Sequence, residues 1–114
     1  MAIQTATEKN SLATKYGTDA AYGAVYTTAP GASAGTEPSG GTPAYARKAL
    51  SWSAASGGVI TATATFDIPT GTTVVGIGVH TAVTAGTYLD GGAITSQAFS
   101  SQGTLSVTFT YTQS

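Results

Sequence analysis

The fold of this chain depends on the stretch Val59-Ile60-Thr61-Ala62-Thr63-Ala64-Thr65-Phe66-Asp67-Ile68, in which apolar and polar residues alternate without a break. A period of two predicts a half-buried β-strand, because successive side chains of a strand point to opposite faces. Pro69-Thr70-Gly71-Thr72 follows and predicts a turn, since proline fixes φ and glycine tolerates positive φ. The predicted inward face consists of Ile60, Ala62, Ala64, Phe66 and Ile68, and the outward face of Thr61, Thr63 and Thr65.

A second strand is predicted from Thr73 to Thr81, and we expect it to form a central antiparallel hairpin with the first. Val75, Ile77 and Val79 share one of its faces. The other face carries Val74, Gly76, Gly78 and His80 and is nearly free of bulky side chains. A glycine pair within a strand indicates a bulge, or the close approach of another backbone or a large ring.

Further strands are predicted on both sides of this pair. An Asp-Gly step between short apolar segments is a hairpin signal, so Asp90-Gly91-Gly92 predicts a turn. Together these segments indicate an all-β fold: an antiparallel β-sandwich or jelly-roll-like domain of about seven short strands. The missing helices exclude a parallel β/α architecture. The further strands are expected at residues 24–28, 49–54, 87–89, 93–94 and 104–112, with Leu105, Val107, Phe109 and Tyr111 of the last facing inward.

The N-terminal segment predicts a short helix or an arm. Thr5-Ala6-Thr7-Glu8 matches a capping box, and Gly17 is a candidate C-terminus. The apolar stripe is too sparse to hold a helix alone, so we expect residues 1–17 to be a largely disordered N-terminal arm and residues 18–114 to be the β-sandwich domain. Ile3, Leu12 and Tyr16 are the candidate docking-arm residues that become ordered on a neighbouring subunit, and a frayed arm is the alternative.

Composition restricts the function. The chain has 114 residues, of which 8% are charged, and a net charge of −1, which argues against nucleic acid and anionic membranes as partners. Without cysteine there is neither a disulfide framework nor a thiolate metal site, and we expect no cofactor and no metal. The first residues lack a signal-peptide pattern and no apolar run reaches bilayer length, so we expect synthesis in the cytoplasm.

The predicted core is thin. Hydrophobic residues make up 41% of the chain, but many of them are alanine, and Leu, Ile, Val and Phe together account for less than one fifth. Such a domain buries little apolar area per residue, and binding to copies of itself would add stability. We therefore expect a closed oligomer.

The loop from residue 30 to residue 44 contains the one apparent catalytic motif. Gly31-Ala32-Ser33-Ala34-Gly35 matches G-x-S-x-G, but a nucleophile elbow follows a strand, precedes a helix and needs an acid and a histidine. Only Asp67 and His80 could supply these groups, and a Pro-Gly turn leads into the motif. We interpret the match as a coincidence and expect no catalytic residues.

Three residues are candidates for structural roles. Glu37 and Arg47 form a candidate loop-pinning pair, although Arg47 next to Lys48 is also consistent with a solvated basic pair. Trp52 is a candidate core plug, expected to lie against the bare face of Gly76 and Gly78. An exposed tryptophan that stacks on a sugar is the alternative.

Several segments resemble a family of small bacteriophage virion proteins, commonly described as tail fibre or minor structural proteins and typical of phages of actinobacteria. The resemblance covers roughly residues 25–95. The Gly-Gly to Tyr-Ala-Arg segment and the Phe-x-x-Pro-x-Gly-Thr-x-Val turn are its most specific parts. It rests on residues 27–31, Glu37, residues 40–41, 45–47, 50–52, 66–74 and 87–89, and Gly92-Ala93.

The resemblance implies a non-enzymatic virion structural protein whose partners are copies of itself and the major capsid protein or tail proteins. We expect a capsid decoration protein that attaches to the outer shell as an oligomer, since the chain lacks the heptads or collagen-like repeats of a self-sufficient fibre. The alternative is a tail fibre or tail-tip component, with glycan binding as one form of this alternative. A trimer is favoured by analogy with phage surface proteins, and the predicted location is the virion.

Overall fold

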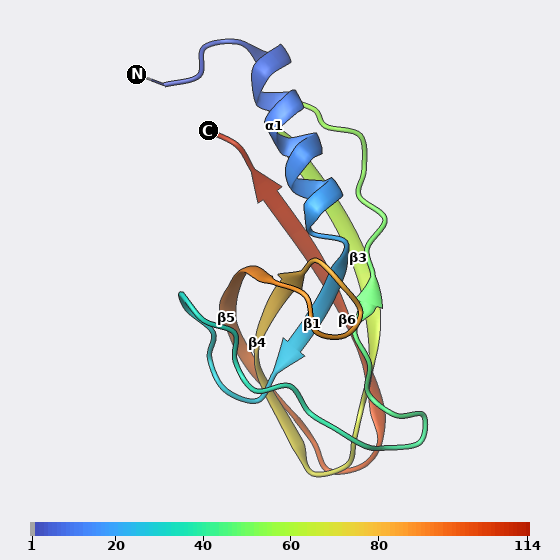
Figure 1. The fold of residues 1–114 in the computed structure, drawn as a ribbon. Coiled ribbons are helices and arrows are strands. Elements are labelled where there is room, and N and C mark those ends of the chain that lie inside the picture. The colour runs from blue at the N-terminus through green and yellow to red at the C-terminus, as the bar shows by residue number, and fades with distance from the viewer. Residues whose placement is uncertain (1) are drawn as a thin grey trace.

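The computed structural model describes residues 2–114 and shows an elongated molecule of 48 × 24 × 23 Å. One helix precedes a series of strands, and the two chain ends lie near the same end of the molecule (Figure 1). In chain order the elements are α1 (Ala6–Asp19), β1 (Tyr22–Tyr26), β2 (Lys48–Ala49), β3 (Val59–Ile68), β4 (Thr72–His80), β5 (Tyr88–Phe99) and β6 (Gly103–Thr112).

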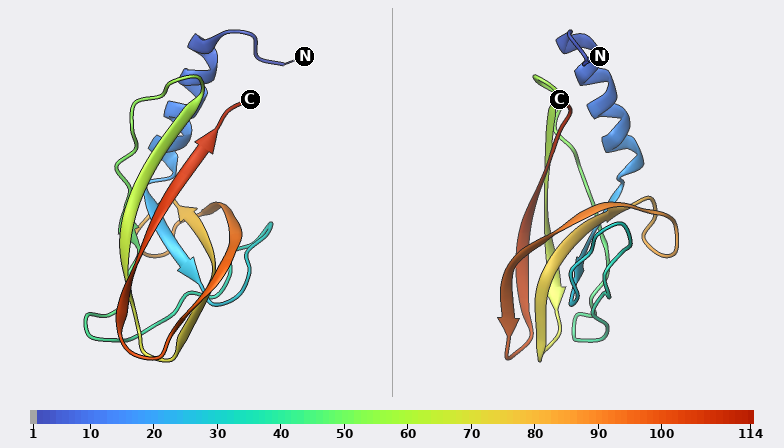
Figure 2. Two further views of the ribbon diagram at one scale, coloured as in Figure 1. Left: turned by 180° about the vertical axis from the view of Figure 1, so that it is seen from behind. Right: turned by 90° about the vertical axis from the view of Figure 1, so that its left-hand side faces the viewer.

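The strands form two antiparallel sheets, which confirms the predicted all-β sandwich. One sheet has the order β2-β1-β4-β5, and the other consists of β3 and β6. The sheets meet at the end opposite α1, where two tight turns lie side by side (Figure 2). There the amide of Gly71 donates to the carbonyl of Phe99 at 2.7 Å, and the Thr70 hydroxyl donates to the carbonyl of Ser100 at 2.9 Å.

The predicted central hairpin is wrong, because β3 and β4 belong to different sheets. β3 pairs along its whole length with β6, whereas β4 lies between β1 and β5. Burial explains the difference: β3 exposes its threonine face, but β4 is buried on both faces along much of its length. The turn at residues 69–71 therefore carries the chain from one layer to the other.

The turn predicted at Asp90-Gly91-Gly92 is also wrong. These residues continue β5 and pair with Val79, Gly78 and Ile77 of β4. Ladder pairing with β4 has therefore overridden the local turn preference of the Asp-Gly step. The strand predicted at residues 49–54 is reduced to β2. The strands predicted at residues 87–89 and 93–94 are both parts of β5, so residues 2–114 contain six strands where about seven were expected.

The core lies between the two sheets and follows the predicted alternation of β3 and β6. The rings of Phe66 and Phe109 meet edge to face with centroids 6.3 Å apart. On the opposite face of this sheet the threonines are exposed, and the hydroxyls of Thr63 and Thr108 are hydrogen-bonded across the strands at 3.1 Å. The buried cluster comprises Ala20, Val25, Ala64, Phe66, Ile68, Val74, Val79, Val107 and Phe109.

Helix α1 is formed and packed, which contradicts the expectation that residues 1–17 are largely disordered in the free protein. The Thr5 hydroxyl accepts a hydrogen bond from the Glu8 amide at 3.2 Å and caps the N-terminus. The helix also continues past Gly17 to Asp19. A side chain at Gly17 would come within 3.1 Å of the Trp52 ring, so this glycine allows close packing and does not end the helix.

The long connection between β1 and β2 forms a third layer over the outer face of the larger sheet. The Tyr26 ring lies over Gly78, and Pro30 lies over Gly76. The glycine pair therefore does admit a ring, as predicted, but Trp52 is the wrong residue. Trp52 is half-buried beside α1, where its indole N–H donates to the carbonyl of Ala20 at 2.8 Å.

We predict that Gly78→Ala destabilises the protein by about 1–3 kcal/mol, the usual cost of overpacking. The new Cβ would come within 2.7 Å of a Tyr26 ring carbon, so the ring must move. Gly92→Ala on the adjacent strand is the matched control, because nothing lies within 4 Å of its Cβ position. Urea unfolding of both variants provides the measurement, and equal stabilities would contradict the third layer described here.

Candidate functional site

Arg47 joins the third layer to the loop that follows β4. Its guanidinium donates to both carboxylate oxygens of Glu37, with Nη2 to Oε2 at 2.9 Å. Nη1 donates to the carbonyls of Ala82 and Ala85 at 3.0 and 2.9 Å. Since the Arg47 side chain is 13% exposed and that of Glu37 26% exposed, this ion pair is largely shielded from solvent.

Tyr45 connects this ion pair to the part of the β1 edge that β2 leaves unpaired. Its hydroxyl donates to Glu37 at 2.8 Å and accepts the amide of Val25 at 3.1 Å. Burial alone would raise the pKa of Glu37, but the hydrogen bonds from Arg47 and Tyr45 outweigh it and lower the pKa. Burial raises the pKa of Tyr45, so its hydroxyl stays protonated and able to donate.

His80 is buried beneath the same loop, with 3% of its surface exposed. Its Nε2 and the hydroxyl of Tyr26 share a hydrogen bond of 2.6 Å. The ring of Tyr88 also packs on His80, and its hydroxyl donates to the carbonyl of Gly31 at 2.8 Å. The buried hydrogen bond between Tyr26 and His80 and the exposed one from Tyr88 to Gly31 therefore help to fix the position of the loop.

The three groups that a hydrolase would need do not converge. His80 is bonded to Tyr26, and the carboxylate of Asp67 accepts a hydrogen bond from Lys48 at 3.3 Å. Ser33 is exposed in the loop, with no helix following it. The arrangement supports the interpretation of G-x-S-x-G as a coincidence.

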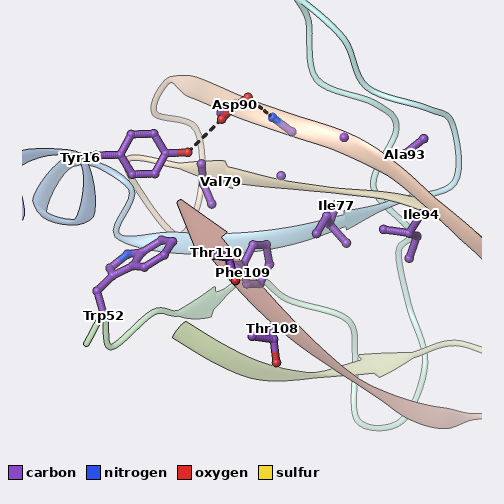
Figure 3. A pocket seen from close by; sticks show the side chains of 13 residues that line it. Tyr16, Trp52, Ile77, Val79, Asp90, Ala93, Ile94, Thr108, Phe109 and Thr110 are labelled. Carbon is purple, nitrogen blue, oxygen red and sulfur yellow. Dashed lines mark hydrogen bonds between the residues drawn. The ribbon is translucent and has the colours of Figure 1, made fainter. Parts of the chain in front are cut away.

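A groove of about 320 Å³ opens between β5 and β6 (Figure 3). Ile77, Ile94 and Phe109 provide apolar surface along it, and Tyr16 and Trp52 stand at one end. The Tyr16 hydroxyl donates to Asp90 of β5 at 3.1 Å, while the Tyr16 ring stacks on Tyr111 of β6 with centroids 3.8 Å apart. Tyr16 thus links both walls at this end, and burial, followed by the Asp90 charge, raises its pKa.

The predicted site residues lie in separate places. Glu37 and Arg47 are in contact, and Trp52 packs against α1 and the edge of the core. Of the three candidate arm residues, Tyr16 is occupied by contacts within its own chain, whereas Leu12 is 39% exposed on α1 and Ile3 is half-buried. A docking role for Ile3 and Leu12 stays a prediction.

The sequence interpretation missed the cluster of Tyr26, His80 and Tyr88 and the role of Asp90. The bare face of Gly76 and Gly78 indicated that a ring approaches, but tyrosines were not considered for it. Asp90 was assigned to a turn. Pairing across strands could have been inferred for His80 and Tyr26 only with the correct order of strands in the sheet.

Within residues 2–114 no group of histidine and acidic side chains is placed to hold a metal ion. The described helix is too short and too polar to cross a membrane.

The chain matches a protein family described as podophage GP4 fiber I protein gp80, and the match covers residues 6–113. No curated protein and no solved structure shows significant similarity to it. The family match spans α1 and all the strands, so helix and sandwich lie within one family region.

We predict that Arg47→Ala lowers the free energy of unfolding by about 1.5–3 kcal/mol, the range for hydrogen bonds to charged groups. The change leaves the carboxylate of Glu37 and two carbonyls without their donor. Lys15→Ala is the control, since it removes the exposed i,i+4 pair with Asp19 and should cost no more than about 0.5 kcal/mol. Urea unfolding of both variants tests this, and equal losses would show that Arg47 does not hold the loop.

A second prediction concerns pH. Burial, followed by the charge of Arg47, lowers the pKa of His80 below its ordinary value of 6.5, with Glu37 opposing. The unfolded chain therefore takes up a proton before the folded one, so His80 destabilises the fold as pH falls below 6.5. The lowered pKa of Glu37 adds a further loss of stability only at more acidic pH, below its ordinary value of 4.5.

The measurement is the free energy of unfolding between about pH 7.5 and about pH 5.5, where His80 dominates. Stability should fall with pH in the unmodified chain, and His80→Gln, which cannot titrate, should flatten this dependence. The groups facing His80 are Tyr26, Tyr88, Arg47 and Glu37, and the tyrosines do not titrate in this window. Identical pH profiles for the two proteins would contradict the assignment.

Proposed function

Since the chain belongs to the podophage GP4 fiber I protein family, we propose that this bacteriophage virion structural protein is a non-enzymatic fibre component. The observation that carries the proposal is the family match over almost the whole chain. The sequence alone favoured capsid decoration, and the family description supports the alternative, a tail fibre component.

The form of the domain suits this role. It is twice as long as it is wide, at 48 × 24 × 23 Å, and its exposed β3–β6 face carries mainly hydroxyls, with the ion pair of Asp67 and Lys48 near one end of β3. Threonine and serine hydroxyls can pack against copies of the chain or another virion protein at a lower desolvation cost than lysine or glutamate. The residues that could have suggested chemistry are engaged in holding the 27–47 loop.

We further propose that the working form is an oligomer whose subunits are parallel, with a trimer the expected state. The thin core gives a physical reason for assembly, since contacts between copies add buried area that one chain lacks. A rotational axis along the long dimension keeps all subunits pointing the same way, as an attached fibre requires. The remaining partner is the phage capsid or tail protein on which the fibre stands.

The copy number in purified virions tests this function. We expect quantitative mass spectrometry to find few copies per particle, in a multiple of the oligomer size, and antibody labelling to mark discrete projections in electron micrographs. Both follow from attachment at a few symmetry-related positions. A copy number close to that of the major capsid protein, with label over the whole shell, would contradict the fibre proposal and support decoration.

A further inference from the structure

We propose that β5 of one copy pairs with β6 of the next copy. Each subunit of the oligomer then pairs through its β5 with one neighbour and through its β6 with the other. This inference rests on the parallel oligomer of the proposed function and names the surface that would build it. The partner is a second copy of this chain. The contact is strand addition on the side of the molecule where the groove between β5 and β6 opens.

β5 and β6 each leave the outer edge of a long strand open, whereas β2, at the opposite end of the larger sheet from β5, has only two residues. The edge of β1 is closed by β2 and by the hydroxyl of Tyr45, which accepts the amide of Val25. The edge of β3 is covered by the segment before it, where the amide of Ser53 donates to the carbonyl of Thr61 at 2.8 Å. β5 and β6 are terminal strands of their sheets, and no hydrogen bond among the described residues joins one to the other.

From Gly91 onward these edges lack the charged residues and proline that often prevent strands from pairing between molecules, although the β4–β5 ladder is irregular where residues 94–96 of β5 face Val75 alone. Soluble proteins protect a free edge with lysine, other charges or proline. From Gly91 to Ser114 the sequence contains no charged residue, no histidine and no proline. Most residues of β5 are exposed nonetheless, and residues 90–94 of this strand line the groove. Two uncharged edges are electrostatically compatible, whereas pairing with a charged partner would gain nothing here.

The strand directions select which edges meet. β5 and β6 run in opposite directions along the molecule, joined by the short turn before Gly103 (Figures 1 and 2). Rotation about an axis parallel to the long dimension places β5 of one copy beside β6 of the next in antiparallel orientation. Pairing of β5 with β5 would require a twofold axis that turns one subunit upside down, which is incompatible with parallel subunits.

The groove supplies apolar surface for the same contact. Ile77 and Ile94 line it and are half-buried. A neighbouring strand would cover these side chains as well as satisfy the backbone edge. Tyr16 closes the groove beside Tyr111, so we place the contact between this residue and the turn at the far end.

Charge on either edge tests the interface. We expect Ser96→Lys in β5 and Ser106→Lys in β6 to be monomeric at a concentration where the unmodified chain is an oligomer by light scattering, because both positions are exposed on the strands that pair. Ser39→Lys adds the same charge at an exposed loop position and should assemble normally. Circular dichroism verifies that each variant is folded. If both strand variants assemble like Ser39→Lys, the proposed interface is wrong.

Cysteine pairs test which edges meet, and the chain has no cysteine of its own. Single cysteines are placed in turn at positions 95–98 of β5 and at positions 106–110 of β6, and each β5 variant is refolded together with each β6 variant and oxidised. We expect disulfide-linked dimers from at least one such mixture and none from a single variant alone. Linkage within a β5 variant alone would show β5–β5 pairing, and absence of linkage in every mixture would also overturn the proposal.

The experiments distinguish failure of this interface from failure of the proposed fibre role. An oligomer that tolerates lysine at both edges, together with a low copy number in virions, would reject this interface and leave the fibre role intact. A high copy number on the shell would reject the fibre role whatever the interface.

Discussion

The layering of this molecule depends on the absence of side chains at Gly76 and Gly78 in β4. The Tyr26 ring and Pro30 occupy the positions where those side chains would lie, so the loop after β1 can cover the sheet directly. β4 thereby becomes buried on both faces, and its neighbours β1 and β5 take their places on either side of it. The strand with the fewest bulky groups on one face is for this reason the centre of the larger sheet.

Polar contacts stabilise this fold in addition to the small apolar core. Arg47 binds Glu37 and two carbonyls of another loop, Tyr45 satisfies the edge of β1, and His80 is bonded to Tyr26. Each of these groups is wholly or partly shielded from water and has a partner, and no buried side-chain nitrogen or oxygen in the described chain lacks one. Such networks favour one arrangement of the loop, because any other would leave buried groups unpaired. A chain with few large apolar residues can be kept ordered in this way.

The alternation in residues 59–68 and 104–112 was sufficient to predict two strands and their buried faces, because a half-buried strand records its orientation in its own sequence. The pairing of strands was not predictable in the same way. A short Pro-Gly turn joins neighbours in one sheet or facing strands of two sheets equally well, and the local pattern of β3 and β4 does not distinguish these cases. Asp90-Gly91 was misread for a related reason: its partners lie in β4, outside any local window. The Glu37–Arg47 contact could be proposed from the sequence, because the chain has few charged residues. Predicting the contact between Tyr26 and His80 would have required the register of β1 on β4.

A sandwich that leaves two edges open on one side, both without charge from Gly91 onward, is incomplete as a single chain, and assembly through those edges is the central claim of this account. Hydrogen exchange of backbone amides, followed by NMR or mass spectrometry in the oligomer and in a dissociated form, tests it most directly. The account predicts that amides of β5 and β6 that point away from their own sheets exchange rapidly in the single chain and become protected in the oligomer, while the exposed loop around Ser39 is unchanged. Rapid exchange of those amides in an intact oligomer would contradict it.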